Sequence, residues 1–153
     1  MKSLLLYDGR GRHGSEKIWA VILDSGDGAN RFLLAFAREQ GQSAARLTAI
    51  GAFRDAVLGY FDWERKAYRR IPVEEQVEVV SFLGDVALTP QGEAMLHAHV
   101  VLARADGTTL GGHLIEGHVR PTLEVMVSES PPHLRRLIDR ESGLALIDIQ
   151  AWQ

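Results

Sequence analysis

The chain has 153 residues, the size of one domain, and its lack of cysteine excludes disulfide scaffolds, thiol nucleophiles and cysteine-ligated zinc. Seventeen basic residues against 20 acidic ones give a formal net charge of −3, which disfavours a protein that binds nucleic acid with its whole surface. No apolar run approaches the roughly 20 residues of a membrane helix, and the first residues lack a signal-peptide pattern. We therefore expect a cytoplasmic protein.

The first quarter of the chain predicts two strands and one helix. Leu4–Tyr7 is a short first strand, and residues 8–16, rich in glycine and charge, are expected to form an extended arm or loop. Lys17–Leu23 has apolar residues without alternation, which is typical of a strand buried on both faces. Ala29–Gln40 predicts a helix, because its apolar residues recur at helical spacing and Gly41 follows as a terminating residue.

From residue 44 onward the pattern turns to β. The predicted strands are Ala44–Ile50, Ala56–Asp62, Ala67–Pro72, Val77–Leu88, Ala94–Arg104, Thr108–His118, Leu123–Ser128 and Leu144–Ile149. Their short connections favour antiparallel hairpins over crossovers, and His133–Arg140 is expected to form a short second helix. The fold class that follows is α+β, a single domain with a mainly antiparallel sheet covered by one main helix.

Four of the six histidines lie between positions 97 and 118. Residues two apart in a strand point to the same face, so His97 and His99 are neighbours on one face of the sheet. A His-x-His pair is a weak signal by itself, since such pairs also form ordinary hydrogen bonds within barrels and interfaces. A third imidazole on the same face would make the group more specific.

The position of His113 depends on the loop of the hairpin that carries it. A two-residue loop would place His113 across from Val100, on the opposite face of the sheet from His99. A three-residue loop would place it directly across from His99. Such loops favour glycine at their last, left-handed position, and Gly107 stands there, so we predict the second register. A bulge at Gly111-Gly112 would shift it again.

Three imidazoles on one sheet face are a zinc-type ligand set with an open fourth position. We therefore predict a divalent transition metal, most readily zinc, at His97, His99 and His113. Glu124, in the next strand, is the acidic candidate for a fourth ligand or for a hydrogen-bond partner of a ligand. No catalytic residue is assigned, because the sequence has neither a Gly-rich phosphate loop nor a Gly-x-Ser-x-Gly elbow.

The order of these motifs resembles the PPC (plants and prokaryotes conserved) domain, which occurs alone in bacteria and archaea and fused to AT-hooks in plants. The segments that carry the resemblance are Val77–Gly84, His97–Ala103, Asp106-Gly107, Gly111–Leu114 and Leu123–Val125, preceded by Phe32–Gly41, Ala49–Phe53 and Leu58–Asp62. The resemblance implies an α+β fold, a homotrimer, and a metal site at the three matching histidines. It divides the chain into an N-terminal strand and arm at 1–16, a PPC-like domain at 17–130, and a C-terminal helix and strand at 131–153 that complete the same domain.

The family resemblance also raises DNA as a partner, because prokaryotic members are commonly described as DNA-binding. An AT-hook places Arg-Gly-Arg-Pro in the minor groove. Here Arg10 and Arg12 flank a glycine, but His13 follows instead of proline. This departure predicts weak or absent minor-groove binding by the isolated chain.

A second group of cations surrounds Tyr68. The four are Arg65, Lys66, Arg69 and Arg70. Together with the tyrosine they would contact phosphates and stack a base, but Glu74 and Glu75 follow closely and would repel a phosphate backbone. A hairpin with a charged outer face explains the same residues.

Two functions stay open from the sequence. The first is a non-catalytic PPC-type homotrimer, a DNA-associated or protein-binding regulator with a histidine metal site. The second is a metal-dependent small-molecule-binding protein or enzyme that uses the His97, His99 and His113 cluster. A free coordination position in a cleft would favour the second, and a fully ligated or dry cluster the first.

Overall fold

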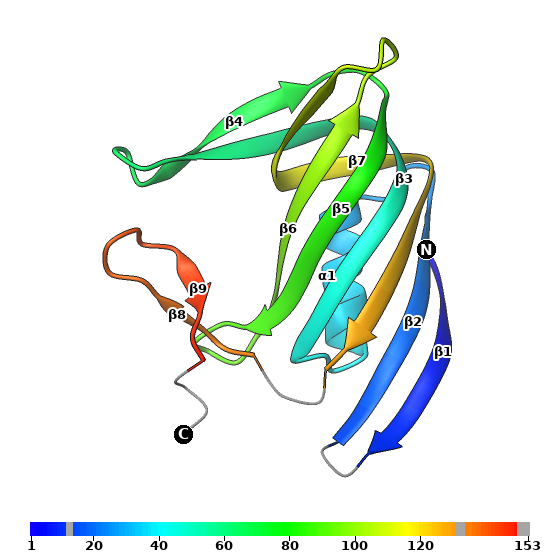
Figure 1. The fold of residues 1–153 in the computed structure, drawn as a ribbon, viewed down its shortest axis with the longest axis vertical. Coiled ribbons are helices and arrows are strands. Elements are labelled where there is room, and N and C mark those ends of the chain that lie inside the picture. Colours follow the sequence, from blue (N-terminus) through cyan, green and yellow to red (C-terminus); the bar gives the residue numbers. More distant parts are fainter. Residues whose placement is uncertain (12–13, 131–133, 150–153) are drawn as a thin grey trace.

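The structure is a computed structural model and describes residues 1–11, 14–130 and 134–149 (Figure 1). Strands dominate it, with a single helix in the described part of the chain. The elements are β1 (Lys2–Gly11), β2 (Gly14–Asp24), α1 (Ala29–Glu39), β3 (Ala44–Asp62), β4 (Ala67–Val73), β5 (Val77–Leu88), β6 (Ala94–Ala103), β7 (Thr109–Glu129), β8 (Arg136–Ile138) and β9 (Ala145–Ile147). None of the described helical residues form a segment long and apolar enough to cross a membrane.

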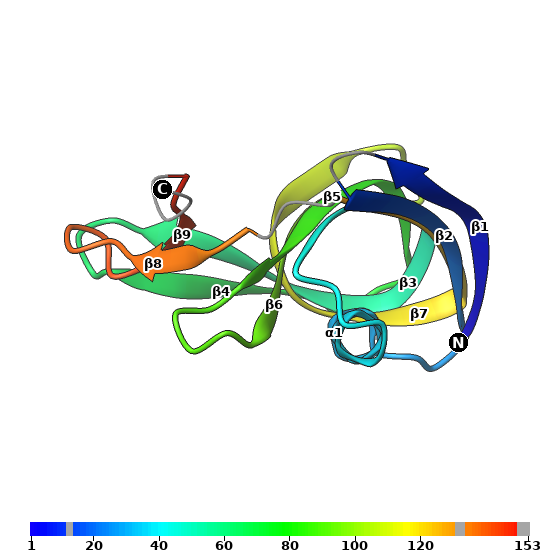
Figure 2. The same cartoon turned by 90° about the horizontal axis from the view of Figure 1, so that it is seen from below.

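The seven strands β1 to β7 form one antiparallel sheet in the order β1-β2-β7-β6-β5-β3-β4. The sheet closes on itself because β7 also pairs with β3. Figure 2 shows the resulting ring, with α1 packed at its side. Apolar residues from β2, β3, β5, β6 and β7 fill the interior together with Leu33 and Phe36 of the helix. The predicted fold class, a mainly antiparallel sheet with one main helix, is confirmed.

Two of the strands are longer than the sequence pattern indicated. The predicted strands at 44–50 and 56–62 are one strand, β3, and those at 108–118 and 123–128 are one strand, β7. Where β3 meets β7, the register shifts between Gly51 and Phe53, between Phe53 and Asp55, and again between Val57 and Leu58. Each shift resets which face a side chain points to. The alternation that identifies a strand is therefore interrupted without the strand ending.

The predicted N-terminal arm is instead part of a hairpin. β1 continues to Gly11 and β2 begins at Gly14, with Asp8 paired to Lys17 and Gly9 to Glu16. Glycines that suggested a loop thus lie within an edge hairpin of the sheet, where one side of the ladder remains open and turn-forming residues are tolerated. Residues 12 and 13 lie outside the described part of the chain.

The predicted second helix is also wrong. Within that range Arg136–Ile138 is strand β8, which pairs antiparallel with β9, and His133 lies outside the described residues. The turn between the two strands is stabilised by Asp139, whose carboxylate accepts hydrogen bonds from the backbone N–H and the hydroxyl of Ser142 at 2.7 and 2.6 Å. This local side-chain hydrogen bonding favours a turn over a helix.

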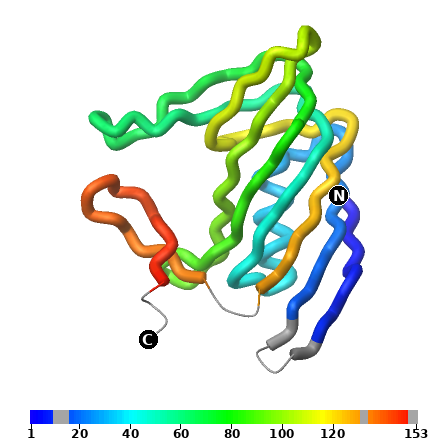
Figure 3. Tube along the Cα trace, viewed as in Figure 1, coloured from blue at the N-terminus to red at the C-terminus, as the bar shows by residue number. Residues whose placement is uncertain are grey.

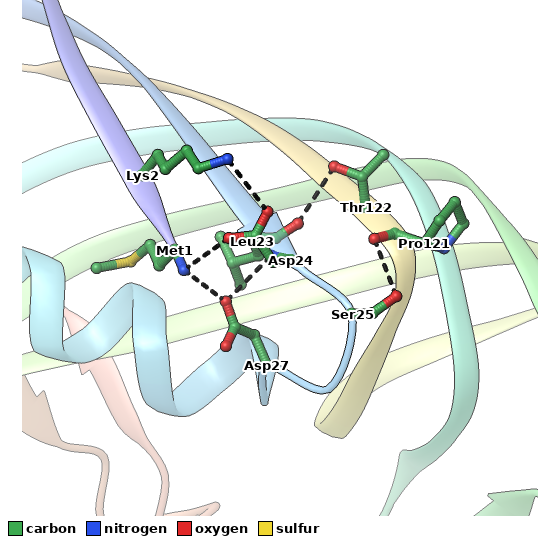
Figure 4. A network of polar contacts seen from close by, with 8 residues as sticks. All are labelled: Met1, Lys2, Leu23, Asp24, Ser25, Asp27, Pro121 and Thr122. Carbon is green, nitrogen blue, oxygen red and sulfur yellow. Dashed lines mark hydrogen bonds and ion pairs between the residues drawn. The ribbon is translucent and has the colours of Figure 1, made fainter.

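The start of the chain is tied to the turn before α1 (Figure 4). The terminal ammonium group of Met1 lies 2.9 Å from a carboxylate oxygen of Asp27 and 3.2 Å from one of Asp24. The hydrogen bond with Asp27, aided by that with Asp24, raises the pKa of the ammonium group. The hydroxyl of Thr122 on β7 donates to the Leu23 carbonyl at 3.2 Å, which joins the same turn to the sheet.

Two hairpins leave the barrel on the same side, as the tube in Figure 3 shows. One is the arm formed by β4 and the end of β3, and the other is the C-terminal hairpin of β8 and β9. Their tips interact electrostatically. The hydrogen bonds from Ser142 lower the pKa of Asp139, and the charge of Lys66, in the turn of the β3–β4 arm, lowers it further.

Candidate metal centre

The hairpin of β6 and β7 brings three of the predicted site residues together. His99 pairs directly with His113, and Ala103 pairs with Thr109. The connecting loop is closed by the hydrogen bond from the Arg104 N–H to the Thr108 carbonyl at 2.9 Å, and Gly107 has a φ of 82°. This is the register predicted from glycine at the left-handed position of a three-residue loop.

The three imidazoles of His97, His99 and His113 form a compact cluster on the outer face of the sheet. One ligand nitrogen from each lies within 4.8 Å of the others. The His97 and His113 rings stack with centroids 5.2 Å apart, and His99 lies edge-on to both at 5.0 and 5.4 Å. Tyr68 on β4 stacks on His113 at 4.6 Å and covers one side of the cluster.

Burial keeps two of these rings uncharged. It lowers the pKa of His113 to about 4, and the nearby His97 and His99 contribute to the shift. The pKa of His99 is lowered as well, again mainly by burial and further by His97. Both rings are therefore neutral at pH 7, which is the form that binds metal ions. Nδ1 of His113 is buried and has no hydrogen-bond partner among the described residues.

A carboxylate stands behind the cluster. Asp85 on β5 lies opposite His97, and its Oδ2 is 3.5 Å from Nδ1 of that ring. Arg136 on β8 donates to the other carboxylate oxygen. Burial alone would raise the pKa of Asp85, but the hydrogen bonds from His97 and Arg136 outweigh burial and lower it. Because Nδ1 of His97 faces Asp85, its Nε2 remains for a ligand.

The donor set fits a divalent transition metal. Three imidazoles, at least two of them neutral, are the ligands that zinc and its neighbours prefer, and a carboxylate that orients one ligand histidine is a usual companion. The metal site predicted from the sequence included neither Asp85 nor Arg136, although Asp85 was recognised as a carboxylate that flanks the histidine strands. The signal for Asp85 was the pairing of β5 with β6, whereas Arg136 is 51 residues from Asp85 and gave no local signal.

The structure does not bring Glu124 to the cluster. His113 lies opposite Gly59 on β3, but Glu124 lies opposite Ile50, on a distant part of the same two strands. β7 runs without interruption between the two residues, and at about 3.3 Å per residue this separates them widely. Glu124 lines a hollow on the sheet with Ile50 and Met126 instead. The acidic side chain that the structure places beside the cluster is that of Asp85, not that of Glu124.

The four candidate nucleic-acid residues around Tyr68 lie on the β3–β4 arm. Three of them already have contacts within the arm. Lys66 Nζ lies 3.4 Å from the centre of the Trp63 ring, Arg69 stands over the Tyr60 ring at 5.4 Å, and Arg65 Nε is 3.9 Å from a carboxylate oxygen of Asp62. Arg70 is exposed. The side chain of Arg10 and the whole of Arg12 lie outside what the structure describes.

Fold and site together define a class of small antiparallel barrels with one helix and a three-histidine cluster on an outer sheet face. The Plants and Prokaryotes Conserved (PCC) domain, the family that the sequence resembles, matches residues 10–131. The chain therefore belongs to this family.

Solved structures and curated relatives agree with this assignment. A plant- and prokaryote-conserved protein from Pyrococcus horikoshii is 29% identical with a TM-score of 0.81, covering 95% of this chain and 96% of its own. A metal-containing protein from Archaeoglobus fulgidus is 34% identical with a TM-score of 0.79, covering 96% and 99%. The bifunctional protein GlmU of a Synechococcus strain is 31% identical over 140 residues, 90% of this chain but only 21% of that protein. The chain thus spans about a fifth of the length of this curated relative.

Proposed function

We propose that this chain is a metal-binding, self-associating member of the family, in which His97, His99 and His113 hold a divalent transition metal, zinc in the first instance. The observation that carries the proposal is the cluster itself: three imidazoles within 4.8 Å of one another, backed by Asp85. The metal-containing relative from Archaeoglobus fulgidus supports the same assignment. We assign no catalytic residue.

The residues of the site have separate tasks. When bound, the metal supplies a Lewis acid with room for a further ligand. Burial keeps His113 unprotonated, so that a proton does not compete for its ring nitrogen. Tyr68 covers one face of that ring and restricts access of water from this side. Asp85 holds His97 through Nδ1 and leaves Nε2 free.

Self-association is supported by an exposed apolar face beside the cluster. Ile50 is 61% exposed, Leu83 60%, Val80 54% and Met126 42%. These residues line a shallow hollow of about 260 Å³ on the outer face of β3, β5 and β7. Leu83 pairs directly with His99, so the apolar face adjoins the cluster. Contiguous exposed apolar surface of this kind is typical of an interface, and the homotrimer that the family resemblance implies would cover it.

Metal content tests the proposal directly. Untagged protein, expressed with metal and purified without chelators, is analysed by mass spectrometry as wild type, His99→Ala and His118→Ala. His118 is the matched control, because it pairs with Asp55 at 2.5 Å and is not part of the cluster. We expect about one transition-metal ion per chain in wild type and His118→Ala, and loss of the ion in His99→Ala. A metal-free wild type would overturn the proposal.

One observation favours the second function that the sequence left open. His99 is exposed, so the cluster faces solvent on that side, as a small-molecule site would require. DNA association has weaker support, because three of the four cations on the β3–β4 arm already contact aromatic or acidic side chains. A ligand screen against metal-loaded protein would separate the two functions. Leu83→Glu is expected to disrupt self-association, so compounds that bind both wild type and this variant would identify a small-molecule site that does not depend on self-association.

A further inference from the structure

The C-terminal hairpin lies beyond residues 10–131, the part that the family matches, yet one of its side chains contacts Asp85, the carboxylate beside His97. Arg136 is the only buried residue of β8 and β9, with 4% of its surface exposed. The apolar residues of the two strands are left in solvent: Leu137, Ile138, Leu146 and Ile147 are all exposed. The hairpin therefore docks on the barrel with a guanidinium group rather than with an apolar face.

The buried guanidinium has specific partners. Its Nη1 donates to the Ala145 carbonyl at 3.0 Å, within the hairpin, and its Nη2 donates to the carboxylate of Asp85, on the barrel. A buried Arg is retained only where its charge is paired, because desolvation of an unpaired charge is costly. Backbone hydrogen bonds also join Leu134 of this segment to Leu88 and Ser43 of the barrel, at 2.7 and 3.2 Å. The Asp85–Arg136 pair thus links the hairpin directly to β5, the strand that carries the carboxylate beside His97.

The two oxygens of Asp85 serve different partners. One accepts from Arg136, and the other faces Nδ1 of His97 at 3.5 Å. A neutral imidazole carries its proton on one nitrogen only, and a carboxylate beside Nδ1 selects the tautomer with the proton on that atom. Nε2 then keeps its lone pair available for a ligand.

We propose that Asp85 and Arg136 are positioning residues of the metal site: Arg136 fixes Asp85, and Asp85 holds His97 as the Nδ1–H tautomer with Nε2 directed at the other two histidines. This inference rests on the proposed metal-binding function. Because coupling between two events is reciprocal, a metal held by His97 also stabilises the docked C-terminal hairpin.

The variant Asp85→Asn separates positioning from simple structural support, since it keeps the shape of the side chain. Buried Arg136 has donors only, so it claims the single amide oxygen. The amide NH₂ is then left facing Nδ1 of His97 and stabilises the opposite tautomer, with a proton on Nε2. We expect long-range ¹⁵N NMR spectra of metal-free protein at pH 7.5 to show His97 as Nδ1–H in wild type and as Nε2–H in Asp85→Asn.

Metal affinity provides the second measurement. Loss of a residue that orients a ligand histidine costs about 10- to 100-fold in metal affinity. We expect Asp85→Asn and Arg136→Leu to bind zinc weaker by this factor in a chelator competition, and Arg136→Lys to recover part of the loss. The matched controls are Asp55→Asn, which alters the Asp–His pair outside the cluster, and Arg135→Leu, which alters the exposed neighbour of Arg136. Both controls keep wild-type affinity.

Hydrogen exchange tests the link to the hairpin. In wild type, zinc is expected to slow the exchange of backbone amides in residues 134–149. In Asp85→Asn, zinc is expected to leave the exchange of these amides unchanged. Equal zinc affinity of wild type and Asp85→Asn, or an Nε2–H tautomer in wild type, would overturn the inference. A wild type that binds no zinc would instead overturn the proposed function, and the tautomer of metal-free protein would still decide whether Asp85 positions His97. Because that readout uses wild type, it stands even if Arg136→Leu does not fold.

Discussion

Gly112 lies on β7, where β6, β7 and β3 meet beneath the cluster. Its replacement by alanine tests whether the site requires the backbones of β7 and β3 to lie this close together. A Cβ at this position would lie 2.9 Å from the carbonyl oxygen of Gly59, about half an ångström short of the 3.4 Å at which ordinary contact begins. The obstacle is backbone rather than a flexible side chain, so β7 must move away from β3. Overpacking of this kind costs about 1–3 kcal/mol in the free energy of unfolding. His113, the next residue, would move away from Tyr68 and from the other histidines.

The assay for Gly112→Ala combines urea denaturation of metal-free protein with zinc competition against a chelator. Gly92→Ala is the matched control: its φ is 83°, nothing lies within 4 Å of the added Cβ, and the strained backbone alone costs about 1–2 kcal/mol. We expect both variants to lose stability, but only Gly112→Ala to lose zinc affinity as well. The reasoning is refuted if Gly112→Ala is as stable as wild type and binds zinc equally well.

Three further predictions concern the exposed apolar face, the Asp55–His118 pair and DNA binding. Leu83→Glu places a carboxylate in the apolar face and should give monomers in light scattering, while Arg38→Glu on the helix should not. Burial alone would raise the pKa of Asp55, but the hydrogen bonds from His118 and Arg54 outweigh the effect of burial, so the pKa is lowered. Ionised Asp55 therefore stabilises the fold at pH values above its unfolded pKa of about 3.9, and this stabilisation is lost as the pH falls through its lower pKa in the folded state. Urea denaturation should accordingly show that Asp55→Asn loses less stability than wild type below about pH 4. Fluorescence anisotropy should give a Kd for A·T-rich duplex DNA weaker than about 1 µM at 0.15 M salt, and nanomolar binding would contradict this.

The part of the site within one hairpin could be predicted because turn chemistry determines register. Gly107 at the left-handed position of the loop places His113 across from His99, and the period of two in a strand places His97 beside it. The antiparallel sheet followed from short connections in the same way. Both results depend on residues close in sequence. The long strands β3 and β7 were divided in the prediction because bulges near Phe53 reverse the alternation within a continuous strand.

The rest of the site could not be predicted because its residues meet only in the folded barrel. Arg136 lies in a strand of three residues, too short for any alternation to be recognised, and its neighbours gave a helical pattern instead. A buried Arg has no sequence signature of its own, since its burial depends on a carboxylate elsewhere in the chain. Here that carboxylate, Asp85, belongs to a strand whose pairing with β6 brings it opposite His97. One carboxylate thus faces His97 with one oxygen and accepts from Arg136 with the other, so the burial of Arg136 depends on a contact between strands that no local sequence pattern records.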